Sequence, residues 1–401
     1  MNIGNPLPAS AQRLFFRIWR PGVLVLGLLL IVYLLYFRHL GTLLPGYNTA
    51  ELQAYTQSAN WHNIASNPVN APYSILVWFL TAVLHHHLLA TRIISACFGT
   101  LAMVAFFFII RPWYSFRIAS LGTLLFATSA GFLHVARLGT PQILQMGVLA
   151  LLAIAVWYRR SRHRTPVGYI ALGLCALLWY IPGMVWFELL GCALVWRSLW
   201  GQVRRTTQPH RAGAAAAFVA VLAPLVVASI RDPHVLLVAS GLPAGMDVAR
   251  HIGINLWHTV TAIGIRGRGD PLQWVGRAAL LSATERVLAA LGLYVYLYRE
   301  RSMRAIFLAS SAAIAVTLIS FGNGVGFATI IPLLYLAIVH GLDHLLGRWF
   351  AVFPRNPIAR ITGVSVVCIM LAFSIFYQAR VYFIAWPHNA ATRQAFSLPP
   401  S

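Results

Sequence analysis

The sequence predicts an all-α polytopic membrane protein with about 11 transmembrane helices. Of its 401 residues, 59% are hydrophobic and 9% are charged, whereas about a quarter of the residues of soluble proteins are charged. The mean hydropathy is +0.73. Apolar stretches of about 20 residues recur along the whole chain, and each is long enough to cross a hydrocarbon layer about 30 Å thick.

Positive charge separates these apolar stretches. All 30 basic residues are Arg, and the net charge is +22. Most of the Arg residues lie in short breaks between apolar stretches, which is typical of cytoplasmic loops that contact anionic lipid headgroups. The charge therefore indicates membrane topology and contact with membrane lipids, and it argues against a nucleic-acid partner.

The first span and the loop behind it define the expected orientation. Residues 1–21 contain three Arg, which predicts a cytoplasmic N-terminus and a retained first span over 22–37 in the plasma membrane. The segment 39–90 contains no Arg and is interrupted by Gly, Pro and Asn. We therefore expect this segment to be an outward-facing loop with short interfacial helices.

The later apolar stretches alternate between Arg-rich and Arg-poor breaks. Every break that alternation places in the cytoplasm is Arg-rich, which supports the scheme. A second long outer loop is expected over 231–277, and 378–401 are expected to form a C-terminal tail. The expected spans after the first are 92–110, 118–133, 142–157, two that meet at a hinge over 180–183, 214–230, one that ends near 299, two split by a turn over 321–326, and 361–377.

Acidic residues are few enough to be weighed one by one. The chain has eight, and four of them fall in the two outer loops: Glu51, Asp232, Asp247 and Asp270. Glu188 falls within the sixth span, where an ionisable group is either functional or paired with an Arg of a neighbouring span. The four cysteines lie in apolar stretches without CxxC spacing, so we expect neither disulfides nor a zinc site.

Glu51 is the strongest candidate for chemistry. It follows the first span directly, in a stretch rich in polar and aromatic residues. Thr49 is placed to cap a helix with Glu51 in its first turn, so a purely structural role at a helix N-terminus is the competing interpretation.

Four short stretches carry a family resemblance that covers roughly residues 20 to 200. In order they are Tyr47 to Glu51, Ala71-Pro72-Tyr73, Arg92-Ile93-Ile94-Ser95-Ala96-Cys97-Phe98-Gly99 and Arg137-Leu138-Gly139-Thr140-Pro141-Gln142. Their order is similar to that of the GT-C superfamily of glycosyltransferases, specifically the protein O-mannosyltransferase and lipid A aminoarabinose transferase branch, glycosyltransferase family 39. The resemblance implies a GT-C-like core over 22–200, with the remaining spans over 201–377.

The resemblance also implies a reaction. The protein would transfer a hexose or pentose from a polyprenyl-phosphate donor to an outward-facing glycan, lipid or protein by a single inverting displacement. Glu51 would be the general base. Arg137, then Arg92, would hold the lipid phosphate. Further candidates for binding or support are Tyr47, Arg266, Arg268, Asn48, Gln142, Glu188 and Asp270.

Two departures from the family pattern remove negative charge. Asn48 stands where the first loop of the family often has an acid, and Gln142 stands where the family commonly has Asp after the Pro of the second turn. Since hard cations require several oxygen ligands, these changes argue against a divalent ion, and no other cofactor is expected. Two alternatives remain open: a non-catalytic protein of the same fold that binds lipid-linked substrates, and a transporter for such substrates.

Overall fold

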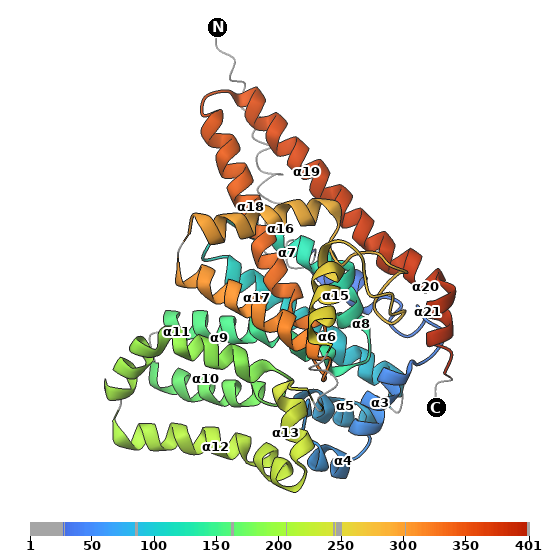
Figure 1. The fold of residues 1–401 in the computed structure, drawn as a ribbon, viewed down its shortest axis with the longest axis vertical. Coiled ribbons are helices and arrows are strands. Elements are labelled where there is room, and N and C mark those ends of the chain that lie inside the picture. Colours follow the sequence, from blue (N-terminus) through green and yellow to red (C-terminus); the bar gives the residue numbers. More distant parts are fainter. Residues whose placement is uncertain are drawn as a thin grey trace, which may run out of the picture.

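The fold is almost entirely helical. A computed structural model describes residues 27, 29–84, 87–161, 164–205, 207–243, 245, 251–300 and 302–398. These residues form helices joined by turns and loops, with one isolated β-bridge between Tyr47 and Leu398 (Figure 1). The all-α prediction is confirmed for this part of the chain. The N-terminal residues 1–21 and Asp247 lie outside the described residues.

The first half of the chain contains the first loop and the helices that frame it. The π-helical turn η1 is followed by three short helices of the loop and then by longer helices. The elements are η1 (Tyr33–Phe37), α3 (Thr49–Ser58), α4 (Trp61–Ser66), α5 (Ala71–Leu84), α6 (His87–Ile110), α7 (Phe116–Thr128), α8 (Ala130–Arg137), η2 (Pro141–Met146), α9 (Gly147–Arg160), α10 (Arg164–Leu178) and α11 (Met184–Arg205). Three short helices thus lie in the segment expected to form the first loop, while its interfacial, outward-facing position stays a prediction.

The second half contains the remaining long helices and a folded C-terminal segment. Within its described residues, the expected second loop contains two short helices. The elements are α12 (Gln208–Arg231), α13 (Pro233–Ser240), α15 (Ile252–Gly264), α16 (Ala283–Tyr298), α17 (Met303–Phe321), η3 (Phe327–Thr329), α18 (Ile331–Val352), α19 (Pro357–Arg380), η4 (Val381–Ala385), α20 (Trp386–His388) and α21 (Ala390–Ala395).

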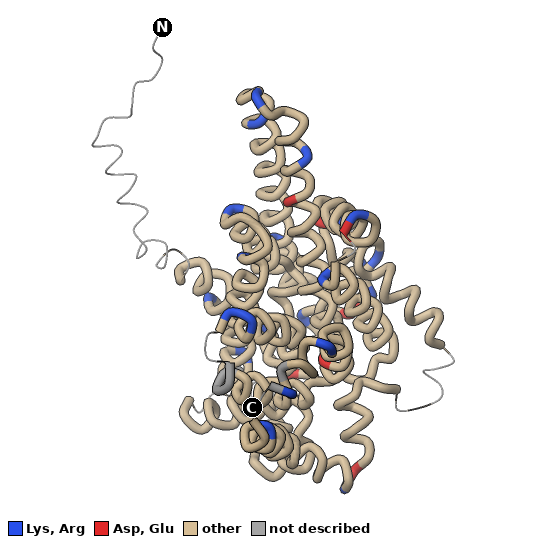
Figure 2. The backbone as a smooth tube through the Cα atoms, turned by 90° about the vertical axis from the view of Figure 1, so that its left-hand side faces the viewer, with Lys and Arg blue, Asp and Glu red and all other residues tan. Residues whose placement is uncertain are grey.

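Six helical segments of the described chain are long and apolar enough to cross a membrane, and a bent pair makes a possible seventh. The six are Leu89–Ile110, Pro141–Arg160, Gln208–Arg231, Met303–Phe321, Phe327–Val352 and Pro357–His388. The chain is thus a multi-pass membrane protein by length and composition, while the count of about 11 spans stays a prediction. Figure 2 shows basic residues at the tip of the hairpin formed by α18 and α19, as expected for a helix break outside the apolar layer.

The third predicted span is broken. The sequence predicts one helix over 118–133, but α7 and α8 meet at an angle of 61°. Ser129 lies at the break in an extended conformation, and its hydroxyl accepts a hydrogen bond from Phe132 N at 3.3 Å. Ser129 therefore caps a new helix instead of continuing the old one. The break turns α8 toward the first loop.

The first half of helix α18 is buried in the bundle and is packed closely against α16. Of the 18-residue apolar stretch within Phe327–Val352, 72% is buried inside the protein. A Cβ atom on Gly292 of α16 would lie 1.9 Å from the carbonyl oxygen of Ala337, and one on Gly341 would lie 2.1 Å from that of Leu288. The two backbones therefore touch, which only glycine permits and which is common where helices pack in membranes.

A buried carboxylate ties α16 to both C-terminal long helices. Glu285, 1% exposed, forms a capping box with Ser282. It also accepts hydrogen bonds from the hydroxyl of Tyr335 at 2.7 Å and from the side-chain amide of Gln378 at 2.6 Å. These neutral donors satisfy the carboxylate and fix α18 and α19 beside α16.

Candidate functional site

Glu51 lies at the N-terminus of α3 and is held there by a capping box. The side chain of Asn48 accepts a hydrogen bond from Glu51 N at 2.8 Å, and Asn48 N donates to Glu51 Oε2 at 3.4 Å. The cap is therefore Asn48 and not Thr49, one residue earlier than expected. This reciprocal arrangement holds the Glu51 carboxylate next to its own helix N-terminus.

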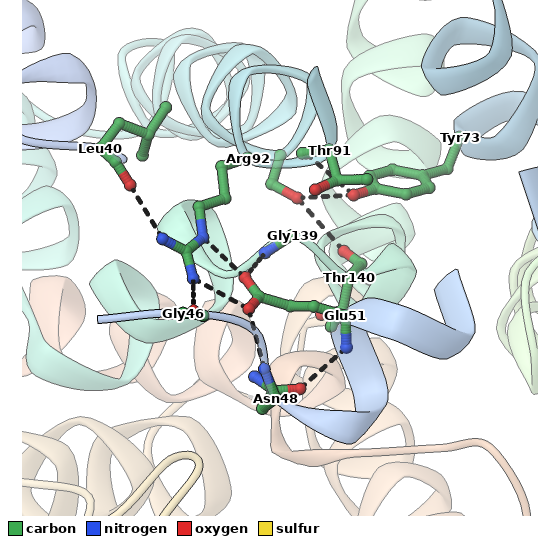
Figure 3. Close-up of polar contacts among 10 residues, drawn as sticks. Leu40, Gly46, Asn48, Glu51, Tyr73, Thr91, Arg92, Gly139 and Thr140 are labelled. Atoms are coloured by element: carbon green, nitrogen blue, oxygen red, sulfur yellow. Dashed lines mark hydrogen bonds and ion pairs between the residues drawn. The ribbon is translucent and has the colours of Figure 1, made fainter. Parts of the chain in front are cut away.

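Arg92 of α6 forms a two-pronged ion pair with Glu51 (Figure 3). Its Nε donates to Oε1 at 2.8 Å and its Nη2 donates to Oε2 at 2.9 Å. The exposed fractions of the two side chains are 2% and 0%. Gly139 N also donates to Oε1, at 2.8 Å. With the bond from Asn48, four hydrogen bonds occupy the carboxylate, about as many as its two oxygens have lone pairs.

The guanidinium of Arg92 also fixes the chain before α3. Its Nη1 donates to the carbonyl oxygen of Leu40 at 3.3 Å, and its Nη2 donates to that of Gly46 at 2.9 Å. Arg92 therefore connects the segment after the first span with the first loop and α6. Loss of this side chain would release all three.

The stretch 92–99 presents one face of α6 to α8 and its following turn. Residues three or four apart share a helix face, and here the hydroxyl of Ser95 donates to the carbonyl oxygen of Thr140 at 3.3 Å. A Cβ atom on Gly99 would lie 2.6 Å from the Cβ of Ala136. The spacing of Arg, Ser and Gly that carried the family resemblance is thus the spacing of this contact face.

Gly139 brings the second turn onto the ion pair. A Cβ atom at this position would lie 2.5 Å from Thr91 Oγ1 and 3.1 Å from Glu51 Oε1. Only glycine lets the backbone N–H of the turn reach the carboxylate. The turn over 137–142 and the first loop, far apart in the sequence, therefore meet at Glu51.

Arg137 lies at the C-terminal end of α8 and is 3% exposed. Its Nη1 and Nη2 donate to the carbonyl oxygens of Leu35 and Arg38 at 2.6 and 2.7 Å. The guanidinium also lies over the rings of Tyr382 and Phe383, at 5.6 and 5.2 Å from their centroids. These partners are uncharged, so they leave the positive charge of Arg137 uncompensated.

Arg92 and Arg137 face the same cavity, which we call the arginine pocket. The cavity is small, with a volume of about 10 Å³, close to what a single water molecule needs. Its lining consists of Leu40, Leu43, Leu44, Arg92, Arg137, Leu138, Tyr382 and Trp386. Glu51 is not part of the lining, because Arg92 stands between its carboxylate and the cavity. The structure thus brings together the two predicted phosphate ligands, with the predicted base behind one of them.

Residues 386–398, here called the C-terminal segment, cover this region. Tyr47 N donates to the carbonyl oxygen of Leu398 at 2.9 Å, and Leu398 N returns a bond at 3.3 Å. Trp386 Nε1 donates to the carbonyl oxygen of Pro271 in the second loop at 3.0 Å. Trp386 and Phe396 are 1% and 0% exposed. The segment therefore joins the first loop to the second.

Tyr47 lies beneath this segment, and its buried hydroxyl has no hydrogen-bond partner among the described residues. Burial raises the pKa of Tyr47 to about 12, and the negative charge of Glu51 contributes to the rise. The phenol is therefore neutral at physiological pH and available as a donor.

Comparison with known proteins identifies the fold. No protein-family model matches the chain, and no curated protein matches it by sequence. Among solved structures, that of ArnT from Cupriavidus metallidurans bound to undecaprenyl phosphate superimposes with a TM-score of 0.55. The match covers 94% of this chain and 77% of the ArnT chain, at 14% sequence identity. This chain shares its fold with ArnT. The likeness at this identity concerns the fold alone, so membership of the GT-C superfamily stays a prediction.

The ArnT-like core does not bring every predicted residue to the arginine pocket. Arg266 and Asp270 are exposed in the second loop, and Asp270 caps its own turn through a bond from Leu272 N at 3.0 Å. Arg268 donates to Thr259 Oγ1 at 2.6 Å and lies over the ring of Phe327. None of these side chains lines the arginine pocket.

Gln142 and Glu188 also have local partners. The side-chain oxygen of Gln142 accepts a hydrogen bond from the amide of Gln273, so the residue at the family's acidic position joins the second turn to the second loop. The carboxylate of Glu188 accepts a hydrogen bond from Trp179 Nε1 at 2.8 Å. Its observed partner is thus a Trp and not the Arg that one interpretation of the sequence expected.

Several residues that build the site were not singled out by the sequence. Gly139 was quoted only as part of a motif, and nothing in the composition of the tail marked Trp386 and Leu398 as neighbours of the first loop. Among the described residues, no group of three or more His, Cys, Asp or Glu side chains converges as metal ligands would.

Proposed function

We propose that this protein is a membrane glycosyltransferase that takes a sugar from a polyprenyl-phosphate donor. The observation that carries the proposal is the pair of buried guanidinium groups, Arg92 and Arg137, that face one cavity beside the carboxylate of the first loop. Arginine offers planar forks of N–H donors that match phosphate oxygens. The fold shared with ArnT, whose structure was solved with undecaprenyl phosphate bound, supports the same choice of ligand.

The electrostatics of the arginine pocket suit a departing phosphate. Arg137 has only carbonyl and aromatic partners, so its charge is available to an anion. Its Nε is buried without an acceptor. Fixed positive charge in a site with little water stabilises the negative charge that grows on the phosphate as the bond to the sugar breaks. An anionic leaving group of this kind needs no proton.

Glu51 is the proposed general base, and Arg92 controls its availability. In the described conformation its four hydrogen bonds occupy the carboxylate. A lipid phosphate that binds Arg92 competes for the same two N–H groups and would free both carboxylate oxygens in part. Glu51 then takes the proton of the acceptor hydroxyl while the hydroxyl oxygen attacks the anomeric carbon. The bond from that carbon to the phosphate oxygen breaks, its electron pair leaves with polyprenyl phosphate, and the configuration inverts.

A non-catalytic protein of the same fold is the second candidate, and the burial of Glu51 favours it. A carboxylate that is 0% exposed and lines no described cavity resembles a structural ion pair. Such a protein would bind the lipid phosphate through Arg92 and Arg137 and transfer nothing. Such a protein would have no glycan, lipid or protein acceptor.

Replacing Glu51 with Gln is the decisive test. Gln keeps the size of the side chain and its place in the capping box, but it cannot accept the acceptor's proton. We expect transfer of a radiolabelled sugar from polyprenyl phosphate in membranes to fall by at least about 100-fold. Binding of the lipid phosphate should persist.

Glu300→Gln provides the matched control, because Glu300 lies just after the C-terminal end of α16 and is 43% exposed. It should transfer sugar at the wild-type rate. Unchanged transfer by Glu51→Gln would remove Glu51 as the base. Lipid binding by the wild-type protein without transfer to glycan, lipid or protein acceptors would favour the non-catalytic candidate.

A further inference from the structure

The break between α7 and α8 frees backbone groups inside an apolar segment. In a continuous helix, each backbone N–H donates to the carbonyl oxygen four residues earlier. The chain turns by 61° at Ser129, so Ala130 N and the carbonyl oxygen of Ala127 lose these partners. Polar backbone groups in an apolar environment need other partners, and a broken membrane helix obtains them from its neighbours.

Two side chains that are distant in the sequence replace the lost partners. The hydroxyl of Tyr36, in η1, donates to the carbonyl oxygen of Ala127 at 3.0 Å. Ala130 N donates to the side-chain oxygen of Gln378, in α19, at 3.2 Å. Tyr36 and Gln378 are 0% and 3% exposed, so water does not compete for these contacts. The break is therefore held from both sides by other parts of the fold.

Glu285 determines the direction of the Gln378 amide. An ionised carboxylate only accepts hydrogen bonds, and a backbone N–H only donates them. Gln378 lies between one group of each kind, because its Nε2 donates to Glu285 Oε2 at 2.6 Å and its Oε1 accepts from Ala130 N. Turning the amide over would place donor against donor and acceptor against acceptor. Glu285 thus makes Gln378 present its oxygen to the start of α8.

The Glu285 carboxylate is itself held on both oxygens. Its Oε2 also accepts a hydrogen bond from Ser282 N at 2.7 Å, and its Oε1 accepts one from the hydroxyl of Tyr335 at 2.7 Å. The Tyr335 hydroxyl also interacts with the side chain of Ser129. Both side-chain partners of Glu285 therefore reach the residues where the helix breaks. A buried polar network whose members are paired favours one geometry.

Helix α8 connects this network to the candidate site. Its eight residues begin at Ala130 and end at Arg137, so the helix is about 12 Å long. A tilt of about 10° at Ala130 would therefore move Arg137 by about 2 Å, which is enough to break a hydrogen bond. The same tilt would move Gly139, whose N–H donates to Glu51 Oε1. The direction of α8 thus decides whether these groups meet.

We propose that Glu285 and Gln378 are positioning residues for the candidate site. They set the direction in which α8 leaves the break, and so they set the places of Arg137 and Gly139. Neither side chain lines the arginine pocket, so the pair acts through α8 and not by contact with a ligand. The expected effect on lipid binding rests on the proposed function, whereas the effect on α8 does not.

Two measurements on the purified full chain in nanodiscs test the proposal. One is hydrogen–deuterium exchange of peptides that cover residues 130–140, and the other is binding of polyprenyl phosphate. Gln378→Leu removes both hydrogen bonds of the amide, so exchange over 130–140 should become faster. Binding should weaken by at least about tenfold, as expected when a contact with a charged group is lost. Where Gln378→Leu does not fold, Gln378→Asn, which is too short to reach both partners, supplies the same comparison.

Exchanging the two side chains tests the direction of the amide. Gln378→Glu alone sets two carboxylates against each other, and it should weaken lipid binding as Gln378→Leu does. Combining it with Glu285→Gln puts a donor next to the new carboxylate, whose other oxygen can still accept from Ala130 N. The double variant should therefore recover most of the binding and the slow exchange over 130–140. A general loss of packing would give no such recovery.

Ser374→Ala is the matched control on the same helix. Ser374 is buried one turn before Gln378, and its hydroxyl forms a hydrogen bond with that of Ser282 at 2.8 Å. The substitution removes a contact between α19 and α16 without touching the break between α7 and α8. Exchange over 130–140 and lipid binding should both match the wild type.

The outcomes separate this inference from the proposed function. Unchanged exchange over 130–140 in Gln378→Leu, equal effects of Ser374→Ala, or a double variant no better than Gln378→Glu would overturn the positioning role. Faster exchange with unaltered lipid binding would overturn the connection to the site. If the wild-type protein does not bind polyprenyl phosphate, the proposed function fails, and the exchange measurements still decide whether Glu285 and Gln378 hold α8.

Discussion

Replacing Arg92 with Met is expected to destabilise the protein by about 3–5 kcal/mol, because the buried carboxylate of Glu51 loses its cationic partner. The same change removes the hydrogen bonds to the carbonyl oxygens of Leu40 and Gly46, so the first loop should loosen. Equilibrium unfolding of the purified protein in mixed micelles measures the free energy. Binding of polyprenyl phosphate should be lost as well.

A double variant distinguishes an unpaired charge from simple loss of packing. Glu51→Leu combined with Arg92→Met removes both charges, and buried ion pairs replaced by apolar groups often cost little. We expect the double variant to be more stable than Arg92→Met alone. Arg277→Met, which alters an exposed guanidinium of the second loop, should change stability by less than about 0.5 kcal/mol. A double variant less stable than Arg92→Met would contradict the buried-charge explanation.

Gly292→Ala is expected to cost about 3 kcal/mol or more, since the added methyl group has no space. Its carbon would lie 1.9 Å from the carbonyl oxygen of Ala337 and 3.0 Å from Gly341 N. Both neighbours are backbone atoms, so no side chain can turn away and the helices α16 and α18 must separate. The unfolding free energy in micelles reports this cost directly.

Gly347→Ala is the control on the same helix pair. Gly347 belongs to α18, the helix against which Gly292 of α16 packs, but a Cβ atom at Gly347 meets nothing within 4 Å. Alanine favours a helix over glycine by about 0.8–1.0 kcal/mol, so this variant should be as stable as wild type or more so. Equal losses of unfolding free energy for Gly292→Ala and Gly347→Ala would contradict the explanation that the close contact between α16 and α18 requires glycine at position 292.

The fold was largely predictable because charge and hydropathy are local properties. Arg-rich breaks marked helix ends that the structure places close to the expected positions, for example after α9 and before α12. The bend at Ser129 escaped prediction, because its neighbours are apolar enough for one continuous span. A capping hydroxyl inside an apolar stretch was the available signal, and single Ser residues also occur within straight helices.

The site was predictable in its parts but not in its pairing. The motifs pointed to Glu51, Arg92 and Arg137, and all three lie close to one another. Sequence spacing does not reveal which Arg pairs with Glu51. The pairing depends on how the helices and the turn at Gly139 are placed around the carboxylate in three dimensions.

The contact between Tyr47 and Leu398 has a consequence for biogenesis. The first loop is synthesised early. The C-terminal segment, whose Leu398 pairs with Tyr47, is synthesised only after the long helices of the second half. Until then the region around the ion pair of Glu51 and Arg92 is not covered by the C-terminal segment. We therefore expect this region to be more accessible to solvent in nascent chains halted before residue 386. Maturation of the pocket is then a late event in synthesis, set by the arrival of Trp386 and Phe396.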